Sequence, residues 1–170
     1  MRELSIPPVA VIPEHATLTD PIWRNAEDYP DLAMFARQDE DGWRDVTAAE
    51  FRDQVVALAR GLVAVGVATG DRVGLLSRTR YEWTLFDYAI WAAGGVVVPI
   101  YETSSPDQIA WVLSDSDAVA CVVETAAHAQ ILAGLRDQLP GLKLIWEIDA
   151  DAIADLVGDG ESVDPAAVEE

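Results

Sequence analysis

The hydrophobic pattern of this chain alternates between two periods from residue 47 onward. Short runs of Val, Ile and Leu are typical of buried strands, whereas apolar residues repeated every three or four positions are typical of helices. The predicted helices cover residues 48–65, 80–93, 106–113 and 125–139, and the predicted strands cover residues 72–76, 96–100, 118–123 and 142–148. Because helices that separate strands act as crossover connections, the pattern predicts a doubly wound α/β fold with a mostly parallel sheet and helices on both faces.

The segment 70–105 carries the clearest part of this pattern, with two strands joined by one helix. Thr79 and Glu82 have the spacing of a capping box, so the helix is expected to begin at Arg80. Apolar residues surround this helix almost completely, which predicts that it is largely buried. The Val-rich strand 96–100 is also expected to be buried, inside a sheet that is covered on both faces.

Two further helix starts carry the same capping signature. Thr47 is followed by Glu50, and Ser105 is followed by Pro106 and Gln108. In each pair, the N-cap hydroxyl and the side chain three positions later satisfy N–H groups that the first helical turn leaves unpaired. The signature therefore predicts where both helices begin.

The segment before the first long helix has the pattern of a small hairpin. Residues 32–38 and 43–46 are candidate strands, and the acidic residues and glycine at 39–42 form the turn between them. We place the α/β subdomain at residues 32–148, with this hairpin at its start.

The two ends of the chain show little periodicity. Residues 1–31 contain several prolines and are interpreted as an extended N-terminal arm with a short helix at residues 21–25. Residues 149–170 are acidic and contain glycine. Residues 149–157 are a candidate short helix, and the segment as a whole indicates either a truncated linker or a disordered tail.

Charge and cysteine content exclude several classes of protein. The formal net charge of −19 at pH 7 argues against nucleic acid as a partner, because both molecules would be polyanions. Cys121 is the only cysteine, so no intramolecular disulfide can form, and its apolar neighbours predict a buried structural thiol. The N-terminus lacks the apolar core of a signal peptide, which predicts a cytoplasmic protein.

Complete catalytic motifs are absent from the sequence. Gly61 and Gly66 have the glycine spacing of a phosphate-binding loop, but the Lys and Ser or Thr that follow in such a loop are missing. There is no Gly-x-Ser-x-Gly nucleophile elbow, and the two histidines and one cysteine are too scattered for a zinc site. The aspartates of residues 149–155 lack the pattern of a calcium loop. We therefore assign no catalytic residue and no metal ligand.

Two polar clusters follow predicted strands and are the candidate site. Residues 77–80, Ser-Arg-Thr-Arg, come directly after the first strand, and residues 101–105, Tyr-Glu-Thr-Ser-Ser, come after the second. Open α/β sheets bind ligands at the carboxyl ends of their strands. The alternative is that Thr79 and Ser105 are only helix caps, while the charged residues are solvated or paired.

A series of motifs in residues 45–123 resembles a known family. The motifs are Gly-Val-x-x-Gly-Asp-Arg-Val at 66–73, Glu-Trp at 82–83, Ala-Gly-Gly-Val-x-Val-Pro-Ile-Tyr at 93–101 and Ser-x-x-Gln-Ile at 105–109. In this order and spacing they resemble the N-terminal part of the adenylate-forming, or AMP-binding, enzymes. The match is best to the bacterial long-chain fatty acyl-CoA synthetases, and Tyr-Glu-Thr-Ser at 101–104 favours that branch.

The resemblance implies a two-step ligase of lipid metabolism. A fatty acid carboxylate attacks the α-phosphate of ATP to give an acyl-adenylate, and the thiol of coenzyme A then takes the acyl group. Magnesium assists the first step by neutralising phosphate charge. ATP, CoA and Mg²⁺ are thus implied for an intact enzyme, whose lipid substrate would suit peripheral contact with a membrane.

The sequence also departs from the family pattern. The Ser/Thr/Gly-rich phosphate loop, the adenine and ribose motifs and the C-terminal lysine are missing, so the chain is expected to be an N-terminal fragment that is inactive alone and binds no cofactor by itself. Its partner would be the remainder of the synthetase, and a homo-oligomer is left open. The resemblance places only Tyr101, Glu102 and Thr103 near a substrate, as part of the acyl-pocket wall.

Two alternatives remain at the level of sequence. The chain could belong to an adenylating enzyme for another carboxylate, such as an aryl or amino acid. It could also be a binding or assembly module that derives from a synthetase and has lost catalysis.

Overall fold

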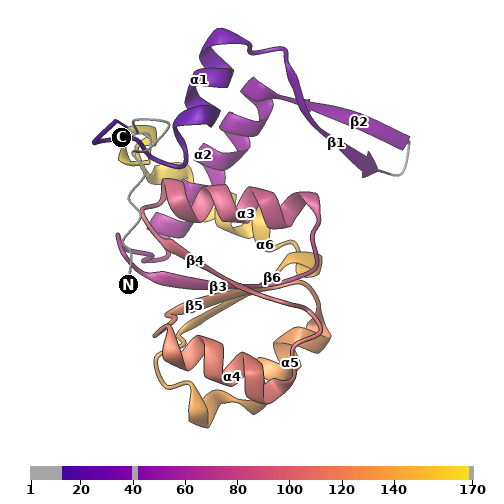
Figure 1. The fold of residues 1–170 in the computed structure, drawn as a ribbon, viewed down its shortest axis with the longest axis vertical. Coiled ribbons are helices and arrows are strands. Elements are labelled where there is room, and N and C mark those ends of the chain that lie inside the picture. Colours follow the sequence, from indigo (N-terminus) through magenta and orange to yellow (C-terminus); the bar gives the residue numbers. More distant parts are fainter. Residues whose placement is uncertain (1–12, 40–41, 169–170) are drawn as a thin grey trace, which may run out of the picture.

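A four-stranded parallel sheet forms the centre of the computed structural model, which describes residues 13–39 and 42–168 (Figure 1). The strand order is β4-β3-β5-β6. The strands are β3 (Arg72–Leu76), β4 (Val96–Ile100), β5 (Ala120–Val123) and β6 (Leu144–Glu147). In register, Val73 lies between Val97 of β4 and Ala120 of β5. The predicted strands are thus confirmed, although β5 and β6 are shorter at their ends than expected.

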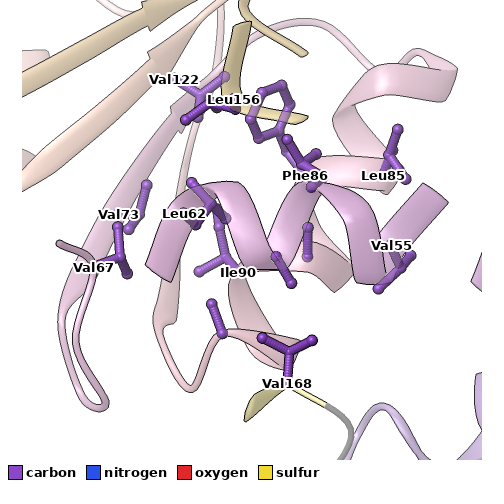
Figure 2. Close-up of a cluster of buried hydrophobic side chains, with 14 of the residues drawn as sticks. Val55, Leu62, Val67, Val73, Leu85, Phe86, Ile90, Val122, Leu156 and Val168 are labelled. Carbon is purple, nitrogen blue, oxygen red and sulfur yellow. The ribbon is translucent and has the colours of Figure 1, made fainter. Parts of the chain in front are cut away.

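Helices cover both faces of this sheet (Figure 1). One apolar cluster joins α2, α3 and α6 to side chains such as Val73 and Val122, and Figure 2 shows part of it. A second cluster joins α4 and α5 to the opposite face, where Cys121 and Val123 point. The helices are α2 (Ala48–Ala64), α3 (Tyr81–Ala92), α4 (Pro106–Asp115), α5 (Ala126–Gly134) and α6 (Ala152–Asp159). The predicted doubly wound α/β fold is confirmed.

The hairpin lies apart from this sheet, at one side of the molecule (Figure 1). Its strands β1 (Ala33–Asp39) and β2 (Gly42–Thr47) pair in antiparallel register, and the tip of the predicted turn, residues 40–41, lies outside the described residues. Phe35 of β1 packs on Phe51 of α2, with ring centroids 4.6 Å apart. The hairpin is therefore attached to the α/β layers through an aromatic contact.

The predicted N-terminal arm includes a helix, α1 (Asp20–Asp28), which is longer than the turn expected at residues 21–25. Its buried residues Ile22 and Ala26 face α2. Residues 1–12 of the arm lie outside the described residues.

Two of the three predicted capping boxes are confirmed. Thr47 accepts from the Glu50 N–H at 3.2 Å and Ser105 from the Gln108 N–H at 3.3 Å, with the reciprocal bond present in each case. The Thr79 box is wrong, because α3 begins one residue later than expected, with Arg80 as its N-cap and no side-chain cap. The carboxylate of Glu82 instead binds two arginine side chains.

The expected burial of β4 is also wrong. Across the described residues 13–39 and 42–168, this strand has a partner on one side only, so it forms an edge of the described sheet. Val96 is 47% exposed and Pro99 is exposed as well. An edge position explains the proline, which has no N–H to donate to a second neighbour.

The disordered alternative for the acidic C-terminal segment is wrong for residues 149–168. This segment forms α6 flanked by the short 3₁₀ turns Ile148–Ala150, Gly160–Ser162 and Pro165–Ala167. Leu156 and Val168 are almost completely buried against the core. Arg60 of α2 donates to the carbonyls of Val163 and Glu161 at 2.7 and 2.8 Å. Apolar burial thus outweighs the acidic composition of this segment.

Cys121 is completely buried, as expected of a structural thiol. Burial raises the pKa of the Cys121 thiol to about 12, so the group stays protonated at neutral pH. Among the described residues, none of the helices has both the length and the apolar character needed to cross a bilayer.

A close contact between α2 and α6 explains Gly61, one of the two glycines whose spacing is similar to that of a phosphate-binding loop. A Cβ atom added to Gly61 would overlap the backbone carbonyl of Leu156. Gly160 lies at the same contact, because a Cβ there would approach the Gly61 nitrogen to 2.5 Å. Gly61 therefore lets two backbones approach each other, and Gly66 ends α2 with a φ of 98°.

Replacement of Gly61 by alanine should lower the free energy of unfolding by about 1–3 kcal/mol, since α6 must move away from α2. Alanine has the higher helix propensity, so propensity alone predicts the opposite sign. Urea denaturation of the chain measures this change. Gly134→Ala is the matched control, because a Cβ at this position of α5 meets no atom within 4 Å. A Gly61→Ala variant as stable as the control would contradict the close contact.

Candidate functional site

The parallel strands bring both predicted polar clusters to one edge of the sheet. Ser77 follows β3 and Tyr101 follows β4, and the two strands are hydrogen-bonded neighbours. A cavity of about 250 Å³ lies between these clusters. Its lining consists of Ser77, Thr79, Trp83, Pro99, Ile100, Tyr101 and Glu102. Of the three residues singled out from the sequence, Tyr101 and Glu102 line the cavity, whereas Thr103 is exposed and lies outside its lining.

The lining of this cavity combines an apolar and a polar part. Trp83, Pro99 and Ile100 supply the apolar surface, and hydroxyl and carboxylate groups supply the rest. Ile100 is 4% exposed and Tyr101 is 83% exposed, so the cavity leads from a buried end at the strand to an open end at Tyr101. A ligand with an apolar body and a polar head fits such a lining.

Glu124 is a site residue that the sequence did not single out. It directly follows β5 and is only 3% exposed. Its carboxylate accepts from the Arg78 N–H at 3.0 Å and from the Ser77 hydroxyl at 3.3 Å. The Arg78 Nε atom lies 2.6 Å from the other carboxylate oxygen. The sequence did contain a signal for Glu124. It is an acidic residue directly after a predicted buried strand, and the two polar clusters chosen as the candidate site also directly follow strands.

Strand order explains why Glu124 meets residues 77–80. The chain leaves β3 toward β4 on one side, and leaves β5 toward β6 on the other side. The carboxyl ends of β3 and β5 are thus a topological switch point, where open α/β sheets form a crevice. Glu124 and Ser77 are 47 residues apart in the sequence, yet the Ser77 hydroxyl donates a hydrogen bond to the Glu124 carboxylate at this point.

A chain of ion pairs extends from this point to the hairpin. Arg80 contacts Asp149 at 2.8 Å and Glu82 at 2.7 Å. Glu82 also accepts from Arg37 of β1 at 3.0 Å. Burial alone would lower the pKa of the Arg80 guanidinium, but the hydrogen bonds to Asp149 and Glu82 outweigh it and raise this pKa. Arg80 therefore stays charged and joins three segments of the chain.

A groove of about 570 Å³ lies beside these ion pairs, between the hairpin and residues 77–80. Arg37, Arg78 and Arg80 line it together with Trp43 of β2. Within residues 13–39 and 42–168, no three His, Cys, Asp or Glu side chains gather closely enough to hold a metal ion. Arginines and aromatic rings thus characterise the groove, and nearby carboxylates neutralise these arginines.

The fold and the motifs at the strand ends agree with a comparison to known proteins. The model of a family described as AMP-binding enzyme matches residues 22–169. The chain belongs to the AMP-binding enzyme family. This result confirms the resemblance that the motifs in residues 45–123 indicated.

Relatives in the AMP-binding family include a bacterial ligase with a long aligned region. The chain is 43% identical over 169 residues to the long-chain-fatty-acid–CoA ligase FadD15 of Mycobacterium tuberculosis, an alignment that covers 98% of this chain and 28% of the relative. It is 29% identical over 128 residues to the long-chain-fatty-acid–CoA ligase heimdall of Drosophila melanogaster, covering 73% of this chain and 19% of the relative. The chain therefore matches the N-terminal part of such ligases and spans less than a third of their length.

Solved structures of the AMP-binding family share the fold. The N-terminal domain of FACL13 from Mycobacterium tuberculosis aligns with a TM-score of 0.72 and 25% identity, covering 88% of this chain and 37% of that chain. The anthranilate CoA ligase AuaEII, in complex with anthranoyl-AMP, aligns with a TM-score of 0.74 and 23% identity, covering 86% of this chain and 28% of that chain. At this identity the second likeness shows the fold alone.

Asp87 gives the site region a pH dependence. This carboxyl lies on α3, one turn beyond Trp83, and burial raises its pKa from 3.8 to about 6. Because the folded-state pKa lies above the unfolded value, the folded state binds more protons between these two values. Stability therefore falls as the pH rises through this window, and the charged carboxylate opposes folding at neutral pH.

Replacement of Asp87 by asparagine should raise the free energy of unfolding at pH 7.5. The full shift corresponds to about 3 kcal/mol, but the group is half exposed, so solvent screening reduces the expected gain to about 1 kcal/mol. Denaturation at several pH values measures the gain, which should vanish below about pH 4, where both states are protonated. A gain for Asp87→Asn that stays constant over the whole pH range would contradict this titration.

Proposed function

We propose that this chain is the N-terminal part of a long-chain fatty acid–CoA ligase. In the first step, a carboxylate oxygen of the fatty acid bonds to the α-phosphorus of ATP, and pyrophosphate leaves. In the second step, the CoA sulfur bonds to the acyl carbon, AMP leaves, and the thiol gives up its proton. The identity to a bacterial long-chain ligase over 98% of the chain supports this activity for the intact enzyme.

The cavity at the ends of β3 and β4 is the feature that supports a fatty acid as the ligand. The apolar side chains Trp83, Pro99 and Ile100 suit the methylene groups of an acyl chain. Thr79 offers a hydroxyl donor to a carboxylate, whereas the single proton of the Ser77 hydroxyl is held by partners inside the protein. Tyr101 and Glu102 then form the outer wall of the acyl pocket, and Thr103 stands beyond it.

Charge sets the orientation of the acid in this proposal. Glu102 at the open end of the cavity repels a carboxylate, whereas the Thr79 hydroxyl can donate a hydrogen bond to one. The acid therefore turns its head toward Thr79 and away from Glu102. In this arrangement the acyl chain follows the apolar lining.

The nucleotide chemistry is assigned to other parts of the enzyme. The family implies ATP, CoA and Mg²⁺ for the intact ligase, but the described residues contain neither a metal-holding group nor a phosphate-loop sequence. We therefore derive no step through magnesium from these residues and give no residue of this chain a catalytic role. A cytoplasmic location stays a prediction of this proposal.

Placing a large side chain at Thr79 tests the proposed acyl pocket. In the full-length gene product, Thr79→Trp should fill part of the cavity and raise the KM for palmitate about tenfold, because the acyl chain loses room, while the KM for ATP stays unchanged. Steady-state acyl-CoA synthesis measures both constants. Ser114→Trp is the matched control, since Ser114 is exposed near the C-terminal end of α4, which leads into the amino end of β5, whereas the cavity lies at the carboxyl ends of the strands.

Three outcomes would contradict parts of this proposal. An unchanged KM for palmitate in Thr79→Trp would contradict the pocket. A full-length enzyme that prefers benzoates or amino acids to long-chain acids would replace the substrate class. ATP–pyrophosphate exchange by the 170-residue chain alone would contradict the assignment of the nucleotide chemistry to other parts.

A further inference from the structure

Glu124 is the only charged residue among residues 13–38 and 42–168 that is buried. A carboxylate in such a position is unfavourable unless charged or polar donors surround it. The donors here are the Arg78 N–H and side chain and the Ser77 hydroxyl, with the Arg80 guanidinium 3.6 Å away. All of these donors belong to residues 77–80, so the Glu124 carboxylate depends on one short segment for its hydrogen bonds and ion pairs.

Residues 77–80 lie between the cavity and the arginine groove, which is the groove lined by Arg37, Arg78 and Arg80. Ser77 and Thr79 line the cavity of the acyl proposal, whereas Arg78, Thr79 and Arg80 line the arginine groove. Thr79 belongs to both linings and therefore stands in the wall between them. Any shift of this segment would therefore change the shape of both the cavity and the arginine groove.

The backbone of this segment has little other support. Strand pairing of β3 with β4 and β5 ends at Leu76, and helical hydrogen bonding begins only after the N-cap Arg80. Between these points Glu124 supplies the acceptor for the Arg78 N–H. The Glu124 side chain belongs to neither apolar cluster. Val122 and Val123 anchor β5 in these two clusters, so β5 does not depend on Glu124 for its packing.

We propose that Glu124 is a positioning residue for the acyl cavity. Its carboxylate holds residues 77–80 at the switch point, so that Ser77 and Thr79 keep their places in the lining of the cavity. This inference rests on the proposed function, since it names the residue that shapes the same cavity. Glu124 acts through this segment and has no contact with the reacting atoms.

Kinetics of the full-length enzyme test this role in two variants. Glu124→Gln keeps the shape and an acceptor for the Arg78 N–H but loses the charge, and its KM for palmitate should rise about threefold. Glu124→Ala loses every bond, and its KM for palmitate should rise about tenfold or more. In both variants, kcat and the KM for ATP should stay within about twofold of the parent values. Glu27→Gln on the exposed face of α1 is the matched control and should change none of these constants.

Hydrogen exchange at the Arg78 amide gives a second readout that needs no activity. In the full-length gene product, the Glu124→Ala variant should exchange this amide at least about tenfold faster, because its acceptor is gone, while the core amides of β5 keep their protection.

The outcomes separate the two proposals. Unchanged exchange at Arg78, or an unchanged KM for palmitate in an enzyme that makes acyl-CoA, overturns the positioning role. Uniform loss of protection across β5 would mean that Glu124 only stabilises the fold, and this overturns the role as well. A parent enzyme without acyl-CoA synthesis overturns the proposed function instead, and the Arg78 amide then decides whether Glu124 positions the segment.

Discussion

The backbone hydrogen bonds that hold β3 between β4 and β5 determine where the polar side chains of the site lie. All three strands run in the same direction, so the residues that follow them emerge at one edge of the sheet. Ser77, Tyr101 and Glu124 are far apart in the sequence and become neighbours only through this pairing. The cavity, the buried carboxylate and the arginine groove all depend on it.

A second level of organisation joins the hairpin to this edge. Arg37 of β1 binds Glu82, and its guanidinium also lies 4.9 Å from the centre of the Tyr81 ring. Tyr81 in turn donates to Gln54 of α2 at 2.9 Å. These contacts hold the hairpin beside residues 78–82. One wall of the groove therefore comes from the two-stranded sheet, and the other wall comes from the segment that follows β3.

Local signals predicted the helix starts well where the chemistry of the cap is self-contained. Thr47 and Ser105 are satisfied by residues three positions away, so no distant contact can easily compete. Thr79 failed because Glu82 has stronger partners in Arg37 and Arg80, and charged donors outweigh a single backbone N–H. The prediction for β4 failed for a related reason, because a Val-rich run has the same composition at an edge as in the centre of a sheet.

The order of helices and strands, the parallel sheet with helices on both faces, and the polar clusters that follow β3 and β4 were all predictable from the amino-acid sequence. These features depend on hydrophobic periodicity and short-range capping, which are written in neighbouring residues. Three features required the folded structure: Glu124 binds residues 77–80, Thr103 lies outside the cavity lining, and the acidic segment 149–168 packs on α2. Strand order and helix packing set these positions, because they join residues whose separation in the sequence carries no local signal.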